Sequence, residues 1–178
     1  MSEKMEIAEE IKIPDGIEIT IENDIIHVKG EKGILSRVLS HPRIKMKIKD
    51  NSVKISFSNS SHRKEKALMG TFVAHIKNMI KGVTEGFEYK MKTVYSHFPI
   101  KTNVEGDYFL IHNFLGERSP RKAKILDQVQ VEVKGDDITV TGIDKEKVGQ
   151  TVANIERATK ITNRDIRVFQ DGVYLINK

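Results

Sequence analysis

The stretches GTFVAHI (residues 70–76) and GQTVANI (residues 149–155) share the pattern G-x-x-V-A-x-I. Around each of them, apolar residues recur at intervals of three and four, which is typical of an amphipathic helix with one buried face. Gly82 and Gly86 predict the end of the first helix, after about 18 residues. Asp144 is predicted to cap the start of the second helix. The sequence therefore predicts two similar helices, one in each half of the chain.

Antiparallel hairpins are predicted before each helix. Apolar and polar residues alternate on either side of a short polar turn, which is the pattern of two paired strands. The strands before the first helix are IEITI (17–21) with IIHVKG (25–30), and RIKMKIKD (43–50) with SVKISFS (52–58). Those before the second helix are VQVEV (129–133) and DITVTG (137–142). The stretch FEYKMKTVY (87–95) also alternates and predicts a further strand.

The two halves correspond position by position. Met46, Ile48, Val53 and Ile55 align with Val131, Val133, Ile138 and Val140. The same elements in the same order indicate an internal duplication, and the alternative is two unrelated helices that each follow a hairpin. We expect an α+β fold of two tandem, duplicated domains, each a small, mainly antiparallel sheet packed on one helix. The expected domains are residues 1–95 and 96–178, divided ahead of Pro99.

The composition limits the possible functions. The chain has 178 residues, 30 Lys and Arg against 25 Asp and Glu, a formal net charge of +5, and no cysteine. Disulfides, thiolate catalysis and cysteine-bound zinc are therefore excluded. No signal peptide or membrane span is visible, so we expect a cytoplasmic protein with no membrane partner. The basic balance is compatible with nucleic-acid binding but is a weak argument alone.

No catalytic or metal-binding motif is present. The six histidines are not spaced as metal ligands: His27, His41, His62, His75, His97 and His112. Gly30-Glu31-Lys32-Gly33 fits the G-x-x-G loop of KH domains, but strand-like sequence flanks it, so a strand-to-strand turn is predicted. We expect no catalytic residue, cofactor or metal. The competing hypothesis, an RNA-modifying enzyme, needs an acid–base or metal constellation that the sequence does not show.

Positive charge gathers in three places. Arg43, Lys45, Lys47 and Lys49 share one face of a predicted strand, and Lys54, Lys90 and Lys92 are candidates to extend it. A solvated strand face and a binding surface fit that pattern equally well. The second cluster, in ERSPRKAK (117–124), contains Arg118, Arg121, Lys122 and Lys124. Gly116 and Pro120 exclude a helix there, so an exposed loop or strand edge suited to phosphate contacts is predicted.

The third cluster spans the end of the second helix and the segment after it. It consists of Arg157, Lys160, Arg164 and Arg167. Cations are also favoured at helix C-termini by the macrodipole, which is the alternative explanation. Because arginine makes bidentate contacts with phosphate, the second half is favoured as the RNA-binding face. The aromatic residues are scattered, which favours recognition of folded RNA over stacking on single strands.

Four further stretches carry a resemblance: NFLGERSPRKAKI (113–125), VEVKGDDITVTGIDKEKVGQT (131–151), GQTVANIERATKI (149–161) and RDIRVFQDGVYLI (164–176). They closely resemble the archaeal and eukaryotic branch of the family of ribosomal protein six of the large subunit. The resemblance covers essentially the whole chain, and R-x-F-x-D-G-V-Y-L near its end is a specific motif. The chain departs from the family at Arg157, where glutamine is usual, and so adds a positive charge.

The resemblance implies two tandem α+β domains and direct binding to large-subunit rRNA, mainly by the C-terminal domain. It implies a place at the stalk base near the sarcin-ricin loop, with neighbouring ribosomal proteins beside it and translational GTPases close by. The rRNA contacts it implies are Arg118, Arg121, Lys122, Lys124, Arg164 and Arg167. Phe169 and Tyr174 are expected to pack, and Asp171-Gly172 to form a turn before the last strand. The alternative function is a non-ribosomal RNA-binding adaptor.

Overall fold

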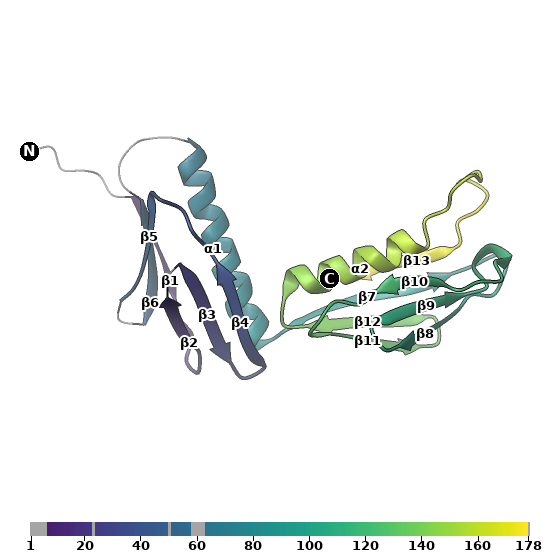
Figure 1. Ribbon diagram of the computed structural model, residues 1–178, viewed down its shortest axis with the longest axis horizontal. Coiled ribbons are helices and arrows are strands. Elements are labelled where there is room, and N and C mark those ends of the chain that lie inside the picture. Colours follow the sequence, from purple (N-terminus) through teal and green to yellow (C-terminus); the bar gives the residue numbers. More distant parts are fainter. Residues whose placement is uncertain (1–6, 23, 50, 58–62, 178) are drawn as a thin grey trace, which may run out of the picture. The chain divides into compact units, whose positions relative to one another are not determined.

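The chain forms two compact units, Met1–Glu85 and Gly86–Lys178. The computed structural model describes residues 7–22, 24–49, 51–57 and 63–177. Each unit combines antiparallel sheets with one long helix (Figure 1). The expected α+β architecture of two tandem domains is therefore confirmed. Among the described residues, no helix is both long and apolar enough to cross a membrane.

The first unit contains two three-stranded sheets and helix α1. Its elements are β1 (Ile7–Lys12), β2 (Glu18–Glu22), β3 (Ile25–Gly30), β4 (Gly33–Val38), β5 (Ile44–Lys49), β6 (Ser52–Phe57) and α1 (Arg63–Thr84). The sheet orders are β1-β6-β5 and β2-β3-β4, which confirms both predicted hairpins. Gly30 pairs with Gly33 between β3 and β4, so the G-x-x-G sequence is a strand-to-strand turn.

Helix α1 is longer than the sequence pattern predicts. It spans 22 residues and includes Gly82, which was expected near its end. Its first turns carry Arg63, Lys64 and Lys66, which continue the helix through their intrinsic propensity although they have no apolar face to bury. The chain leaves the helix after Thr84, and Gly86 adopts a left-handed φ of 78°. Glycine accommodates this conformation without a steric penalty, so Gly86 rather than Gly82 marks the end.

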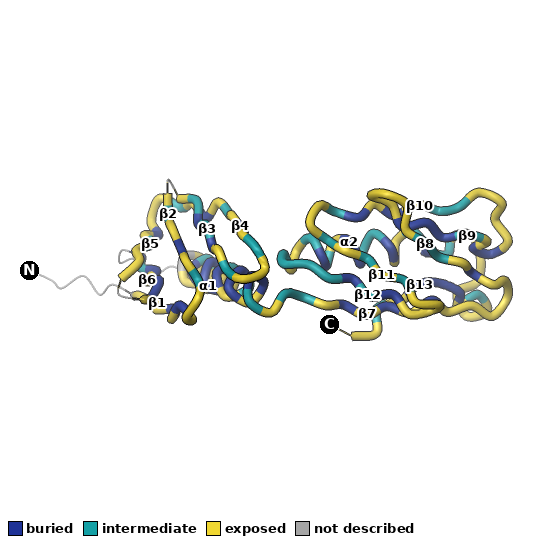
Figure 2. Tube along the Cα trace, turned by 90° about the horizontal axis from the view of Figure 1, so that it is seen from below, coloured by how far each residue is buried: buried dark blue, intermediate teal, exposed yellow. Residues whose placement is uncertain are grey.

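The second unit contains a four-stranded sheet, a three-stranded sheet and helix α2. Its elements are β7 (Phe87–Val94), β8 (Lys101–Glu105), β9 (Tyr108–His112), the 3-10 turn η1 (Phe114–Gly116), β10 (Arg121–Lys124), β11 (Val129–Lys134), β12 (Asp137–Gly142), α2 (Lys145–Ala158) and β13 (Gly172–Asn177). The sheet orders are β11-β12-β7-β13 and β10-β9-β8. Burial alternates along β7 and β11, as strands with one buried face require, whereas β9 carries three successive buried residues (Figure 2).

Strand β7 belongs to the second unit, which moves the division of the chain from residues 95/96 to Glu85/Gly86. It pairs with β12 and β13, and its inward residues Tyr89 and Met91 join the core of the second unit. The sheet β1-β6-β5 and the series β7-β12-β11 have the same order, so β7 is the counterpart of β1. Alternation predicts a strand but not the strand with which it pairs. The division expected from the sequence therefore assigned β7 to the first domain.

Helix α2 packs on its sheets through the residues that the periodicity identified. Val148, Val152 and Ile155 are at most 3 % exposed. A Cβ on Gly142, the last residue of β12, would lie 2.7 Å from Val148 Cγ2, so glycine is required for this close packing. Asp144 accepts a hydrogen bond of 2.9 Å from the backbone N–H of Glu146, and the predicted N-cap is confirmed.

Replacement of Asp144 by alanine removes this cap. We expect Asp144→Ala to lower the free energy of unfolding by about 1 kcal/mol, because a helix N–H loses its acceptor. Urea denaturation followed by circular dichroism measures the change. Asp144→Asn is the matched control, since asparagine also caps helices, and an equal loss in both variants would contradict the capping role.

Candidate nucleic-acid interface

The second and third basic clusters meet at the C-terminal end of α2. Arg121, the first residue of β10, donates from Nη1 to the backbone carbonyls of Ala158 at 2.9 Å and Lys160 at 3.1 Å. Asn154 on α2 also donates to the carbonyl of Lys124, at 3.0 Å. These hydrogen bonds hold together segments that are 30 to 39 residues apart in the chain. We call the cations around this junction the arginine junction: Arg118, Arg121, Lys122, Lys124, Arg157, Lys160, Arg164 and Arg167.

Arg121 is the member of the junction with an internal role. Its Nε and Nη2 donate to the two carboxylate oxygens of Glu117, at 2.8 and 2.5 Å. Its guanidinium also lies 4.2 Å from the centroid of the Phe114 ring. The Arg121 side chain is only 25 % exposed, against 41 % for Glu117. Arginine is suited to this position because its planar fork can bind a carboxylate and helix carbonyls at once.

The pKa of Glu117 is lowered by both basic clusters. The hydrogen bond from Arg121 is the largest influence and lowers the pKa of Glu117 below its ordinary value, against the raising effect of burial. The charge of Arg164 lowers the pKa further, so Arg164 from the third cluster acts on a residue beside the second. A carboxylate held ionised in this way neutralises Arg121 without neutralising the whole junction.

The other seven predicted cations remain exposed. Lys122 and Lys124 alternate with the less exposed Arg121 and Ala123, so they project from the outward face of edge strand β10. Arg164 lies over the Phe169 ring, 4.8 Å from its centroid. The remaining exposed members are Arg118, Arg157, Lys160 and Arg167. The structure thus joins the second and third clusters through Arg121, which has a structural role, and leaves the other seven cations exposed.

A buried carboxylate anchors the segment between α2 and β13. Asp171 is 1 % exposed and accepts hydrogen bonds from the Ser96 backbone N–H at 2.9 Å and its hydroxyl at 3.0 Å. The His97 backbone N–H donates to the other oxygen at 3.3 Å. The His97 ring stacks on Phe169, with centroids 4.5 Å apart, so Phe169 packs as expected. The sequence predicted a turn at Asp171 but gave no sign that it binds a segment 75 residues earlier.

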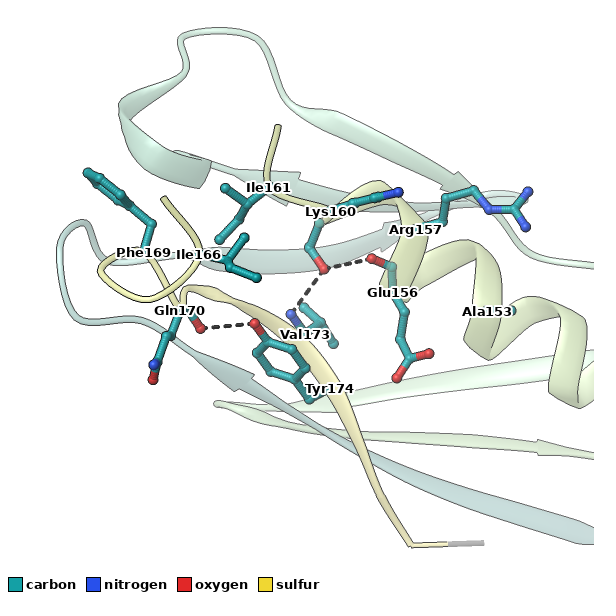
Figure 3. Close-up of a pocket in the computed structure, with 11 residues that line it drawn as sticks. Ala153, Glu156, Arg157, Lys160, Ile161, Ile166, Phe169, Gln170, Val173 and Tyr174 are labelled. Atoms are coloured by element: carbon teal, nitrogen blue, oxygen red, sulfur yellow. Dashed lines mark hydrogen bonds between the residues drawn. The ribbon is translucent and has the colours of Figure 1, made fainter. Parts of the chain in front are cut away.

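An open hollow lies beside this anchor. It has a volume of about 580 Å³ and is bounded by the last turns of α2, the segment around Ile166 and the start of β13 (Figure 3). The Thr159 hydroxyl donates to the Glu156 carbonyl and accepts from the Val173 N–H, at 3.1 and 3.2 Å, which ties β13 to α2. Arg157 and Lys160 contribute cations to its lining, and Ile166 and Tyr174 contribute apolar surface.

The junction offers positive charge on a surface shaped by α2, β10 and the segment before β13. Among the described residues, no set of three His, Asp or Glu side chains is placed to hold a metal ion. Tyr174 donates its hydroxyl to the Gln170 carbonyl at 3.0 Å and is engaged in holding the segment. What the arrangement can do chemically is to present several cations to a polyanion on a rigid frame.

Loss of Arg121 should weaken that frame. We expect Arg121→Ala to lower the free energy of unfolding by about 2 kcal/mol, because it removes charged hydrogen bonds to Glu117 and to the end of α2. Arg118→Ala, a matched change at an exposed position, should alter stability by less than about 0.5 kcal/mol. Urea denaturation of both variants measures the difference, and equal stabilities would refute the internal role of Arg121.

The Asp171 anchor predicts a dependence of stability on pH. Burial raises the pKa of Asp171, but the hydrogen bonds from Ser96 and His97 outweigh it and lower the pKa below its ordinary value. Its contribution is therefore complete above a pH of about 4 and is lost as the pH falls through the lower, folded-state pKa. Asp171→Asn should reduce the melting temperature at pH 7 and show a smaller further decrease on acidification. Parallel melting curves for both proteins from pH 7 to pH 2.5 would contradict this assignment.

Comparison with known proteins is consistent with this architecture. The sequence model of the ribosomal protein L6 family matches residues 13–86 and 98–172, one match for each half of the duplication. The chain is 53 % identical to large ribosomal subunit protein uL6 of Methanobrevibacter smithii over 172 residues, which are 97 % of this chain and 96 % of that protein. It is 49 % identical to uL6 of Methanosarcina mazei and 50 % identical to uL6 of Methanothrix thermoacetophila, each over 97 % of this chain and 98 % of the relative.

These matches confirm the resemblance that the sequence motifs indicated, including its archaeal branch. They also identify a structural ribosomal protein rather than an enzyme. The chain belongs to the ribosomal protein L6 family.

Proposed function

We propose that this chain is a structural constituent of the large ribosomal subunit that binds large-subunit rRNA directly through the arginine junction. Its binding stabilises the rRNA fold near the stalk base and the factor-binding region around the sarcin-ricin loop. Neighbouring ribosomal proteins adjoin it there, and translational GTPases dock close by on the cytoplasmic ribosome. The observation that carries this proposal is the convergence of two basic segments at the end of α2, where Arg121 joins them.

The proposed mechanism is electrostatic and geometric. Folded RNA crowds phosphates together, and exposed arginine and lysine side chains relieve that repulsion while releasing counterions. A frame fixed by Arg121 and Asp171 keeps the cations in place before binding, so little conformational freedom is lost on association. The exposed aromatic residues include Tyr95, Phe98, Tyr108 and Tyr174. Aromatic residues are scattered along the sequence rather than gathered in one strand motif, which favours folded RNA.

The salt dependence of binding tests the junction. Neutralisation of about six phosphates gives a log–log slope of about −4 to −5 for the affinity of the intact chain for its rRNA. Replacement of Arg118, Lys122 and Lys124 by glutamine should make this slope about 2 units shallower. The same change should weaken binding on the order of 10²-fold at 0.1 M salt. Filter binding across a salt series measures both quantities.

The matched control is the triple variant Lys101→Gln/Lys134→Gln/Lys145→Gln, which removes the same amount of positive charge from other parts of the second unit. It should change the affinity little. An affinity that ignores salt, or equal losses in the two triple variants, would refute the junction as the RNA site. Co-sedimentation of the chain with large subunits through a high-salt wash separates the ribosomal function from a non-ribosomal RNA-binding adaptor, which would wash off.

A further inference from the structure

The first unit carries a lysine-rich surface that the arginine junction does not include. Helix α1 packs on one side of its strands, and Val53 and Ile55 are fully buried on that side of β6 (Figure 1). Because successive strand residues face opposite ways, the other side of the sheet β1-β6-β5 presents an alternating set of residues. We call its exposed cations the lysine face: Lys12 on β1, Lys54 on β6, and Lys45, Lys47 and Lys49 on β5.

Two lysines of this face lie directly opposite each other. Lys47 is the register partner of Lys54 across the β5–β6 pair. Like charges opposed in this way destabilise a sheet. Lys45 and Lys49 lie two residues to either side of Lys47, which places same-face residues about 6.6 Å apart along β5. On its β5 side the face is therefore a regular row of positive charge, whereas on its β1 side Lys54 lies opposite Glu10.

Other strands of the same protein show a different arrangement. Lys29 on β3 forms an ion pair of 3.2 Å with Glu18, its register partner on β2. Lys90 pairs with Glu88 at 3.3 Å, and Lys134 with Glu132 at 3.0 Å. On the lysine face Glu10 of β1 is the register partner of Lys54, but its carboxylate accepts a hydrogen bond from the Ser52 hydroxyl. Among the described residues, no carboxylate lies within 4.0 Å of the amino groups of Lys45, Lys47, Lys49 or Lys54.

Protection of a sheet edge does not account for this pattern. Lysine on an exposed edge strand prevents the sheet from pairing with another chain, and β5 is such an edge. Lys54, however, is on β6, the central strand of the sheet, where both neighbours already fill the hydrogen-bonding positions. Edge protection thus explains the lysines of β5 but not Lys54, and an anion bound between Lys47 and Lys54 would relieve the repulsion that Glu10 opposes from one side only.

We propose that the lysine face is a second RNA-binding surface, which docks on the phosphate backbone of folded large-subunit rRNA. The inference rests on the ribosomal function proposed above but uses none of the junction residues. Lysine is a point charge that binds phosphate without reading bases, and its regular spacing suits a polymer with one charge per nucleotide. Ser52 and Ser56, the register partners of Lys49 and Lys45, are small enough to let the backbone approach the sheet.

Footprinting with the full chain tests this surface. Large-subunit rRNA is treated with hydroxyl radicals in the presence of the wild-type chain and of Lys45→Gln/Lys47→Gln/Lys54→Gln. We expect the variant to lose a distinct set of protected nucleotides while it keeps those that depend on Arg118, Lys122 and Lys124. Its affinity at 0.1 M salt should fall about tenfold and its salt slope should become about 2 units shallower. The corresponding Lys→Arg triple variant should retain the protections.

The matched control is Lys64→Gln/Lys66→Gln/Lys77→Gln, which removes three exposed charges from α1 in the same unit. It should preserve the footprint. Unchanged protections in the lysine-face variant would overturn the proposal, as would an equal loss in the α1 control. Unchanged rRNA protections with a lost crosslink to an acidic protein would overturn it in favour of a protein partner. If the wild-type chain protects no nucleotides that depend on Arg118, Lys122 and Lys124, the function proposed for the second unit is refuted instead.

Discussion

The bond between Arg121 and the end of α2 is the constraint on which the second unit depends. A helix leaves its last carbonyls without partners inside the helix, and they need donors from elsewhere. The Arg121 guanidinium donates to the carbonyls of Ala158, the last residue of α2, and of Lys160 just after it. The same guanidinium donates to the Glu117 carboxylate. Because β10 carries Lys122 and Lys124 on its other face, the same contact that completes α2 also positions cations at the surface.

The duplication supplies one scaffold that the two units use differently. In both, a hairpin and a third antiparallel strand form a sheet that is covered by one helix. The second unit adds β13 next to β7, and the segment leading to β13 brings Arg164 close enough to Glu117 to lower the pKa of that carboxyl. The Asp171 anchor holds that added segment, since an irregular stretch has no ladder of hydrogen bonds of its own. The first unit lacks a described counterpart of β13, and its exposed cations lie mainly on a sheet face and on α1.

The local patterns predicted most of this fold because they depend on neighbours in the chain. Strand alternation placed Val53, Ile55, Ile138 and Val140 in the core, and helical periodicity did the same for Val152. Partners that are distant in the chain left no comparable pattern. The pairing of β7 with β12, the role of Arg121 and the anchoring of Ser96 by Asp171 all depend on contacts that form only in the folded unit.

Arg121 also shows why charge clusters overstate a binding site. The sequence treated the four cations of ERSPRKAK as equivalent, yet Glu117 at the start of that stretch neutralises one of them. The signal available in the sequence was an acid, Glu117, four residues before Arg121. Whether the two side chains pair depends on the turn that η1 introduces between β9 and β10. On the lysine face the reverse holds, because β5 contains no acid and Glu10, which lies opposite Lys54, accepts from the Ser52 hydroxyl instead. The position of acidic residues therefore separates structural cations from those available to a phosphate better than the number of cations does.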